Sequence, residues 1–297
     1  MNIRFGYRDL AFPSPELGEL RDSSDLLGDL PALQARMAED GYLLLRGLLP
    51  RATVLQARRT ILEYMAAQEA LTPGEPVLEG VMPRGGRTVP MMGRKGIAHH
   101  PDVLAVVEHP RLFDFFAAYF GEPALTFNYK WLRAVGNERY TGAHYDFVYM
   151  GRGSPRLHTV WIPFGDIPVH QGTLAMCVGS HNLESFAILR ETYGRMDVDR
   201  DRTEGWFTRD PMEIVEKFGG RWLTAPFYAG DVILFGMHTM HASTTNLTNR
   251  FRLSCDVRFQ PASEPADPRW VGEGTGHTAL GKEPLRSMEE ARAAWGL

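Results

Sequence analysis

The chain has 297 residues, of which 44% are hydrophobic and 23% are charged, a composition typical of a folded globular protein and unlike that of a disordered one. Acidic residues slightly outnumber basic ones, and the net charge of −4 gives no overall positive field for nucleic acid or an anionic membrane. The two cysteines, Cys177 and Cys255, are too few for a disulfide framework and form no CxxC zinc motif, which favours a reducing compartment.

No targeting segment stands out in the sequence. The amino terminus lacks an unbroken apolar stretch with a small-residue cleavage site, and no segment approaches the roughly 18 apolar residues of a membrane-spanning helix. We therefore expect a cytoplasmic protein with no membrane partner. Composition leaves the oligomeric state open.

The first part of the chain, about residues 1–124, is predicted to be mostly helical. Apolar residues at helical spacing predict a helix over residues 31–41 that ends at Gly41, and the apolar run at 42–47 predicts a buried strand. Residues 50–67 return to helical periodicity, with Val54, Ile61, Leu62 and Met65 as the expected core stripe. A further helix is predicted over residues 101–120, because Gly121 follows as a stop signal.

Between these helices, residues 80–101 are basic and rich in glycine and proline. The segment has no acidic residue and contains Arg84, Arg87, Arg94, Lys95, His99 and His100. A solvated loop is the simpler interpretation, and a lid over an anionic substrate is the alternative. With Met82, Met91 and Met92 beside these charges, the segment suggests a partly apolar, carboxylated small molecule as the substrate.

From about residue 125 the pattern becomes that of a β protein. Short strand-like runs separated by glycine and proline turns predict a sandwich or barrel, with runs at 125–135, 144–150, 158–164, 173–178, 231–235, 239–243 and 251–259. Residues 183–217 interrupt this pattern as a polar, partly helical insert. We expect one catalytic domain over residues 1–297, with a β core at about 125–262 and a carboxy-terminal tail at 263–297.

The first candidate metal ligands are His144 and Asp146. In a strand, residues two apart point to the same face, so the predicted strand at 144–150 would present an imidazole beside a carboxylate. An isolated HxD motif is weak evidence, since a surface pair is the commoner explanation. Its place at the end of a glycine-punctuated loop, before an apolar run, strengthens the metal hypothesis.

A third ligand is expected after the buried strand at 231–235, from either His238 or His241. Two histidines and one carboxylate on one face form the set that favours non-haem Fe(II) in oxygenases, because open positions remain for substrate and O₂. Catalytic zinc uses similar ligands, so spacing alone does not select the metal.

The strand predicted at 251–259 alternates polar and apolar residues, which places several arginines on one face, among them Arg250, Arg252 and Arg258. This face could simply meet solvent. Alternatively, one guanidinium could point into the barrel and bind a carboxylate in the two-pronged geometry that arginine favours.

Taken in order, these segments resemble the phytanoyl-CoA dioxygenase family of Fe(II)- and 2-oxoglutarate-dependent oxygenases. The resemblance covers much of the chain and rests on an ordered set of segments: DGYLLLRGLL at 40–49, HYD at 144–146, WIP at 161–163, GTL at 172–174, GSH at 179–181, and Gly230-Asp231 through His241, Ser243, Asn246 and Arg252. One departure is Val178, where the family usually has proline before GSH. The resemblance to this family implies a mainly β fold with flanking helices, built on a double-stranded β-helix of the jelly-roll or cupin-like type.

The resemblance also implies roles for particular residues. His144, Asp146 and His241 would ligate Fe(II), and Arg252, eleven residues after His241, would pair with the far carboxylate of 2-oxoglutarate. Ser243, Trp161 and Arg133 would complete the co-substrate pocket, and His181 would be structural.

The implied reaction uses 2-oxoglutarate and O₂ to hydroxylate, desaturate or cyclise a small-molecule metabolite, with release of succinate and CO₂. Related halogenases have a small residue in place of the carboxylate, so Asp146 argues for oxygen transfer or desaturation. Two alternatives remain. One is a cupin-like zinc or manganese hydrolase or isomerase, and the other is a non-catalytic jelly-roll binding module.

Overall fold

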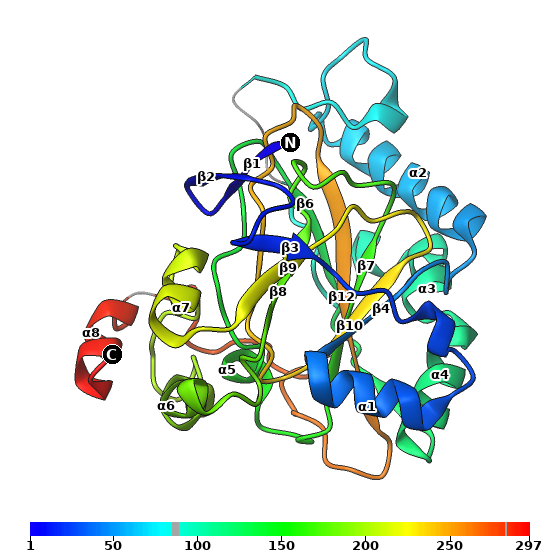
Figure 1. Cartoon of the computed structure of the whole chain (residues 1–297). Helices are drawn as coiled ribbons and strands as arrows, with labels where there is room; N and C mark the ends of the chain where they lie inside the picture. Colours follow the sequence, from blue (N-terminus) through cyan, green and yellow to red (C-terminus); the bar gives the residue numbers. More distant parts are fainter. Residues whose placement is uncertain (85–88, 283) are drawn as a thin grey trace.

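The computed structural model describes residues 1–84, 89–282 and 284–297, and Arg87 of the basic loop lies outside this part of the chain. A mainly β core carries helices on both sides (Figure 1). The helices are α1 (Leu30–Asp40), α2 (Arg51–Ala67), α3 (Pro101–Val107), α4 (Pro110–Phe120), α5 (Phe147–Met150), α6 (Ala187–Glu191), α7 (Pro211–Phe218) and α8 (Met288–Trp295). Short 3-10 turns are η1 (Ser24–Leu26), η2 (Val77–Glu79), η3 (Gly96–His99), η4 (Glu184–Phe186) and η5 (Tyr193–Arg195).

The larger sheet has the strand order β4-β10-β7-β12-β5, with β6 also paired to β12, and its pairings are antiparallel. Its strands are β4 (Tyr42–Leu45), β5 (Ala124–Thr126), β6 (Trp131–Val135), β7 (His158–Pro163), β10 (Val232–Gly236) and β12 (Arg252–Pro261). The non-sequential strand order and the division of the strands between two sheets are those of a jelly roll.

The smaller sheet has the order β11-β8-β9-β3, and its β3–β9 pair is parallel. Its strands are β3 (Leu17–Glu19), β8 (Leu174–Val178), β9 (Arg221–Thr224) and β11 (His241–Ser243). A separate hairpin joins β1 (Asn2–Phe5) to β2 (Arg8–Ala11).

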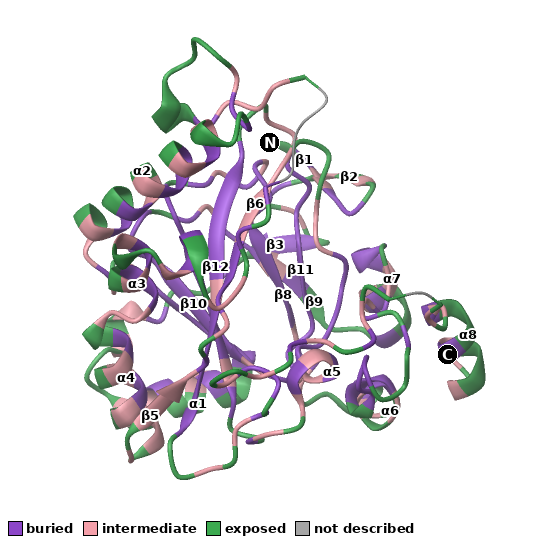
Figure 2. Ribbon diagram, turned by 180° about the vertical axis from the view of Figure 1, so that it is seen from behind, coloured by how far each residue is buried: buried purple, intermediate pink, exposed green. Residues whose placement is uncertain are grey.

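The core is layered, as the alternation in each strand dictates. On β4, Tyr42 and Leu44 pack between the sheets, whereas Leu43 and Leu45 pack against the amino-terminal helices. Both faces of the strand are therefore buried, which explains its continuous apolar sequence. Figure 2 shows this burial along the central strands β10 and β12. The mainly β jelly-roll fold with flanking helices, expected from the sequence, is confirmed.

Three predicted elements differ from the structure. The helix expected over 101–120 is two helices, because Pro110 begins a second helix with His109 as its cap. The first part of the chain also contains β1, β2 and β3, which are too short to leave a clear periodic signal. The strand expected at 144–150 is wrong, since α5 occupies its second half.

Several other predictions hold. α1 ends where Gly41 adopts a left-handed conformation, and the core stripe of α2 is fully buried. Among the described residues, no helix combines the length and the apolar character needed to cross a lipid bilayer.

The first prediction concerns the packing of α4 on the large sheet. The ring of Phe116 is fully buried and stacks on that of Phe259 of β12, with 4.6 Å between ring centroids. Phe116→Ala removes this contact and leaves a cavity, so we expect a loss of about 3–5 kcal/mol in the free energy of unfolding. Urea denaturation measures it, and Leu55→Ala on the exposed face of α2 is the control that should change stability little. Equal losses in both variants would contradict the packing described.

Candidate active site

Three buried side chains from distant parts of the sequence meet at one point. His144, Asp146 and His241 each offer a ligand atom, and these atoms all lie within 4.8 Å of one another. The Oδ1 atom of Asp146 is 3.7 Å from the Nε2 atom of each imidazole. The structure thus brings together the three residues that the sequence singled out as metal ligands.

Backbone pairing places the two histidines. His144 donates its N–H to the carbonyl of His241 at 3.0 Å, and His241 donates in return at 3.1 Å. Residues paired directly in this way project their side chains to the same face. The imidazole centroids are accordingly 4.1 Å apart.

Asp146 reaches the same point by a different route from the one expected. The chain leaves the extended conformation after Tyr145, and Asp146 is in a helical conformation (φ −67°, ψ −23°) at the start of α5. The side-by-side arrangement of His144 and Asp146 therefore comes from a turn and not from strand alternation. A short apolar run such as residues 147–150 fits a buried helical turn as well as a strand, which is why periodicity misassigned it.

The hydrogen bonds of the imidazoles fix which nitrogen faces the centre. The Nδ1 atoms of His144 and His241 lie 2.8 Å and 3.0 Å from the carbonyl oxygens of Gly142 and Thr239, respectively. A carbonyl only accepts, so each Nδ1–H donates and each Nε2 lone pair points inward. Such backbone partners orient metal-binding histidines in general. Burial lowers the pKa of His241 to about 4, so this ring is neutral and able to ligate at neutral pH.

Asp146 is held as a carboxylate by its surroundings. Its Oδ2 atom accepts from the hydroxyl of Thr159 and, at 3.1 Å, from Nη2 of Arg258. Burial alone would raise the pKa of Asp146, but the charge of Arg258 and the proximity of His241 outweigh it and hold the pKa well below its usual range.

The sequence reasoning missed Thr159 and Arg258 as partners of Asp146. These two residues lie opposite each other on β7 and β12, and the Arg258 guanidinium is 4.5 Å from the Trp131 ring centroid. A signal for Arg258 was present, because the alternation of β12 places it on the same face as Arg252.

Arg252 is a buried guanidinium without a carboxylate partner among the described residues. It donates from Nη1 to the hydroxyl of Ser254 and lies over the ring of Trp161, with 5.7 Å to the centroid. Its Nε is buried and has no hydrogen-bond partner in the part of the chain that the structure describes. Burial lowers the pKa of Arg252 to about 10, which leaves it charged at neutral pH. A buried cation with an unmet donor is costly, so the site fits an anionic ligand.

The other residues expected in the co-substrate pocket differ in whether they contact Arg252. Trp161 lies against Arg252, and its expected role in lining the co-substrate pocket stays a prediction. The Ser243 hydroxyl accepts the N–H of Thr141 at 2.8 Å, and its expected assistance to Arg252 is not among the contacts of the described residues. Arg133 donates from Nε to Oδ2 of Asp256 at 2.8 Å and lies opposite Ser254, on the inward face of β6.

Two other histidines have structural contacts. The Nε2 atom of His238 lies 3.0 Å from the carbonyl of Gly194, and its ring stacks on Phe147. His181 of the GSH turn bonds the carbonyl of Ala38 through Nε2. Of the two histidines left open by the sequence after the buried strand, His241 is the one that faces His144 and Asp146.

Comparisons with known proteins agree with this geometry. The family described as "Phytanoyl-CoA dioxygenase (PhyH)" matches residues 37–254, which is most of the chain. A 1-deoxypentalenic acid 11-beta-hydroxylase of Streptomyces arenae is 28% identical over 259 residues, covering 82% of this chain and 85% of the relative.

Solved structures of low sequence identity share the fold. The epimerase SnoN, crystallised with Fe3+, alpha ketoglutarate and nogalamycin RO, matches with a TM-score of 0.57 at 22% identity, covering 88% of this chain and 95% of SnoN. EctD from S. alaskensis, in its apoform, also gives a TM-score of 0.57, at 19% identity, and covers 93% of this chain and 92% of EctD. The match over residues 37–254 establishes that the chain belongs to the phytanoyl-CoA dioxygenase family of oxygenases, as its sequence motifs had indicated.

Proposed function

We propose that the protein is an Fe(II)- and 2-oxoglutarate-dependent dioxygenase that hydroxylates a carboxylated small-molecule metabolite. The observation that carries the proposal is the combination of two buried features, which are linked by Arg258. A two-histidine, one-carboxylate cluster offers inward-facing ligand atoms, and the unpaired guanidinium of Arg252 lies on the same inward face of β12 as Arg258, which bonds Asp146. The cupin-like hydrolase and binding-module alternatives leave this buried arginine unexplained.

The residues present fit both groups. Two imidazoles and a carboxylate are the donor set preferred by Fe(II) in oxygenases. The unmet Nε of Arg252 suits the far carboxylate of 2-oxoglutarate, with the indole of Trp161 as a wall. When bound, Fe(II) and 2-oxoglutarate supply the oxidising chemistry, in which one oxygen atom of O₂ enters the substrate C–H bond and the other enters succinate as CO₂ is lost.

The chain's own residues orient the ligand atoms and set the charge of Asp146. The carbonyls of Gly142 and Thr239 hold both imidazoles in one tautomer. Arg258 and Thr159 keep Asp146 ionised and fix its rotation, so that Oδ1 stays toward the imidazoles. Because Asp146 fills the position that halogenases leave open to halide, oxygen transfer is favoured over halogenation. Hydroxylation is the default outcome, and the same site would serve desaturation or ring closure.

The relatives support a small-molecule substrate. The Streptomyces arenae relative is named for hydroxylation of an organic acid, and SnoN was crystallised with nogalamycin RO. We propose by analogy that this chain acts on a metabolite of secondary metabolism. The carboxylate of this metabolite would provide a negative charge that an arginine near the site can bind.

The proposal is tested by adding Fe(II) and 2-oxoglutarate to the metal-free protein under anaerobic conditions. We expect a weak visible charge-transfer band that appears when both additions are present, because the 2-oxo acid then chelates the iron. The absorption spectrum of the folded protein measures it, and succinate release on admission of O₂ gives a second readout. No band from protein shown to be folded by circular dichroism would reject the function.

A second prediction separates the two histidines that the sequence left open. His241→Gln should abolish binding of one Fe(II) per chain, because it removes a ligand atom from a three-ligand site. His238→Gln should leave iron binding unchanged, since His238 contacts the carbonyl of Gly194 instead. Elemental analysis after anaerobic loading and desalting measures both variants. Loss of iron from the His238 variant alone would reverse the assignment.

A third prediction concerns the co-substrate. Arg252→Gln should raise the KM for 2-oxoglutarate by roughly 30-fold or more, equivalent to about 2 kcal/mol or more for truncating a buried charge pair. Arg250→Gln is the matched control, because Arg250 is exposed two residues earlier and pairs with Glu79. Succinate formation at varied 2-oxoglutarate gives the constants. Equal KM values in the two variants would show that Arg252 does not bind the co-substrate.

A further inference from the structure

A cavity of about 910 Å³ lies along β6, and the mechanism above does not use it. Its lining comes from β6, the following loop, residues 82–84, residues 89–92 and residues 247–251. Two of its lining residues lead directly to the site. Thr141 donates its N–H to Ser243, two residues after His241, and Phe251 immediately precedes Arg252. We call this cavity the arginine chamber, for the three arginines among its lining residues, Arg84, Arg133 and Arg139.

The arginine chamber combines apolar walls with unbalanced positive charge. Met82, Met91, Leu132 and Phe251 are among its apolar lining residues, and Met92 adds an exposed apolar side chain. No aspartate or glutamate is among its described lining residues, although acidic residues outnumber basic ones in the whole chain. A concave apolar site with a few convergent polar groups is typical of small-molecule binding, and the sign of these groups favours an anion.

Arg133 is the arginine best placed to bind that anion. It lies opposite Ser254, so its side chain shares the inward face of the sheet with Arg252 and Arg258. Asp256 holds its Nε at 2.8 Å, while 37% of the side chain remains exposed. Its two amino groups make no hydrogen bond or ion pair among the described residues. The guanidinium is thus fixed at one end and free at the other.

Arg84 and Arg139 differ from Arg133 in exposure. Both are exposed, and exposed ion pairs contribute little to affinity. At the rim of the arginine chamber they would attract an anion, whereas the half-buried and anchored Arg133 would hold it. Burial opposes ionisation of Arg133, but the charges of Asp256 and Asp146 raise its pKa, so the guanidinium stays charged.

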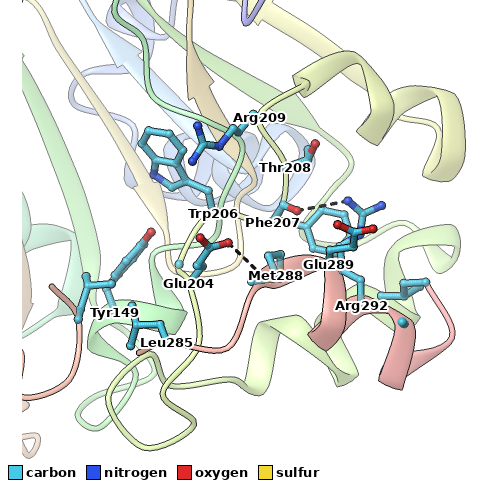
Figure 3. A pocket seen from close by; sticks show the side chains of 14 residues that line it. Tyr149, Glu204, Trp206, Phe207, Thr208, Arg209, Leu285, Met288, Glu289 and Arg292 are labelled. Carbon is cyan, nitrogen blue, oxygen red and sulfur yellow. Dashed lines mark hydrogen bonds between the residues drawn. The ribbon is translucent and has the colours of Figure 1, made fainter. Parts of the chain in front are cut away.

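A second cavity, of about 790 Å³, has a different character (Figure 3). Its charged residues balance, with Glu204 and Glu289 against Arg209 and Arg292. Glu204 accepts the N–H of Met288, and Arg292 pairs with Glu213, so these two charges hold α8 in place. Arg209 lines this cavity, is exposed and makes no side-chain hydrogen bond or ion pair among the described residues, so Arg209→Gln serves as a control for Arg133→Gln.

We propose that the arginine chamber binds the substrate as an apolar carboxylic acid and that Arg133 pairs with its carboxylate. The proposal rests on the proposed function for the reaction, but not for the binding event. It makes Arg133 a specificity-determining residue for the substrate, where the sequence had placed it with the co-substrate. Because Arg133 lies on the inward face near Asp146, the C–H bond brought to the metal would be close to the acid group.

The test compares two probes that differ in one charge. The fluorescent probe 1-anilinonaphthalene-8-sulfonate is apolar and anionic, and N-phenyl-1-naphthylamine has the same ring system without the sulfonate. Each is titrated into the full chain, with and without Fe(II) and saturating 2-oxoglutarate under anaerobic conditions. Arg133→Gln should weaken the anionic probe by about tenfold, because a hydrogen-bonded ion pair is lost, and should leave the neutral probe unchanged.

Two controls test whether the effect is specific to Arg133 and whether it depends on charge. Arg209→Gln should leave both affinities unchanged, and Arg133→Lys should restore most of the affinity for the anionic probe. Decanoate should displace the anionic probe, and methyl decanoate should not. These measurements need no turnover, so a chain that binds the probe through Arg133 but gives no charge-transfer band would refute the proposed function and leave this inference standing.

Three outcomes would overturn the inference. Equal weakening of both probes by Arg133→Gln would mean that the side chain only shapes the cavity. Unchanged probe binding with a raised KM for 2-oxoglutarate would assign Arg133 to the co-substrate. Weakening of the anionic probe by Arg209→Gln alone would move the substrate to the cavity beside α8.

Discussion

The reciprocal hydrogen bonds between His144 and His241 are the constraint on which the site depends. They join the start of the loop that carries Asp146 to the first residue of β11. Once these two backbones are paired, both imidazoles face the same side. The turn into α5 then brings the carboxylate of Asp146 next to them. The ligand set is therefore a consequence of backbone pairing, and side-chain hydrogen bonds then set tautomer and charge.

Around this centre, the arginines on the inward face of the large sheet have different charge partners. Arg258 faces Asp146 and stabilises a negative charge that the protein itself provides. Arg252 lies six residues earlier and lacks such a charge among the described residues, so the partner we propose for it is the carboxylate of a ligand. Arg133 on β6 has one end held by Asp256 and the other open to the arginine chamber. Burial makes the difference decisive, because an unpaired guanidinium is far more costly inside the protein than at its surface.

Segments outside the jelly roll pack against the residues that surround His144. Arg269 is buried in the carboxy-terminal tail and pairs with Asp267 at 2.6 Å, and it also pairs with Asp199 of the insert at 2.5 Å. Asp199 in turn lies 2.9 Å from Nδ1 of His277, whose ring is 5.9 Å from that of Tyr149. Tyr149 meets the His144 ring edge-on at 5.5 Å. A chain of packed and paired groups thus connects the tail and the insert to a metal ligand.

The sequence by itself determined much of this protein. The strand at 42–45, the core stripe of α2 and the stop at Gly41 follow from local periodicity and glycine chemistry, which act over one or two turns of chain. The order of His144, Asp146, His241 and Arg252 was readable as well, because a ligand set needs particular residue types wherever the fold places them. Tertiary structure alone decided the rest. It put Asp146 in a turn, gave His238 a structural contact with Gly194, made Arg258 the partner of Asp146 and left Arg133 facing a cavity. These outcomes depend on which strands pair and in what register, and such long-range pairing has no trace in the local sequence.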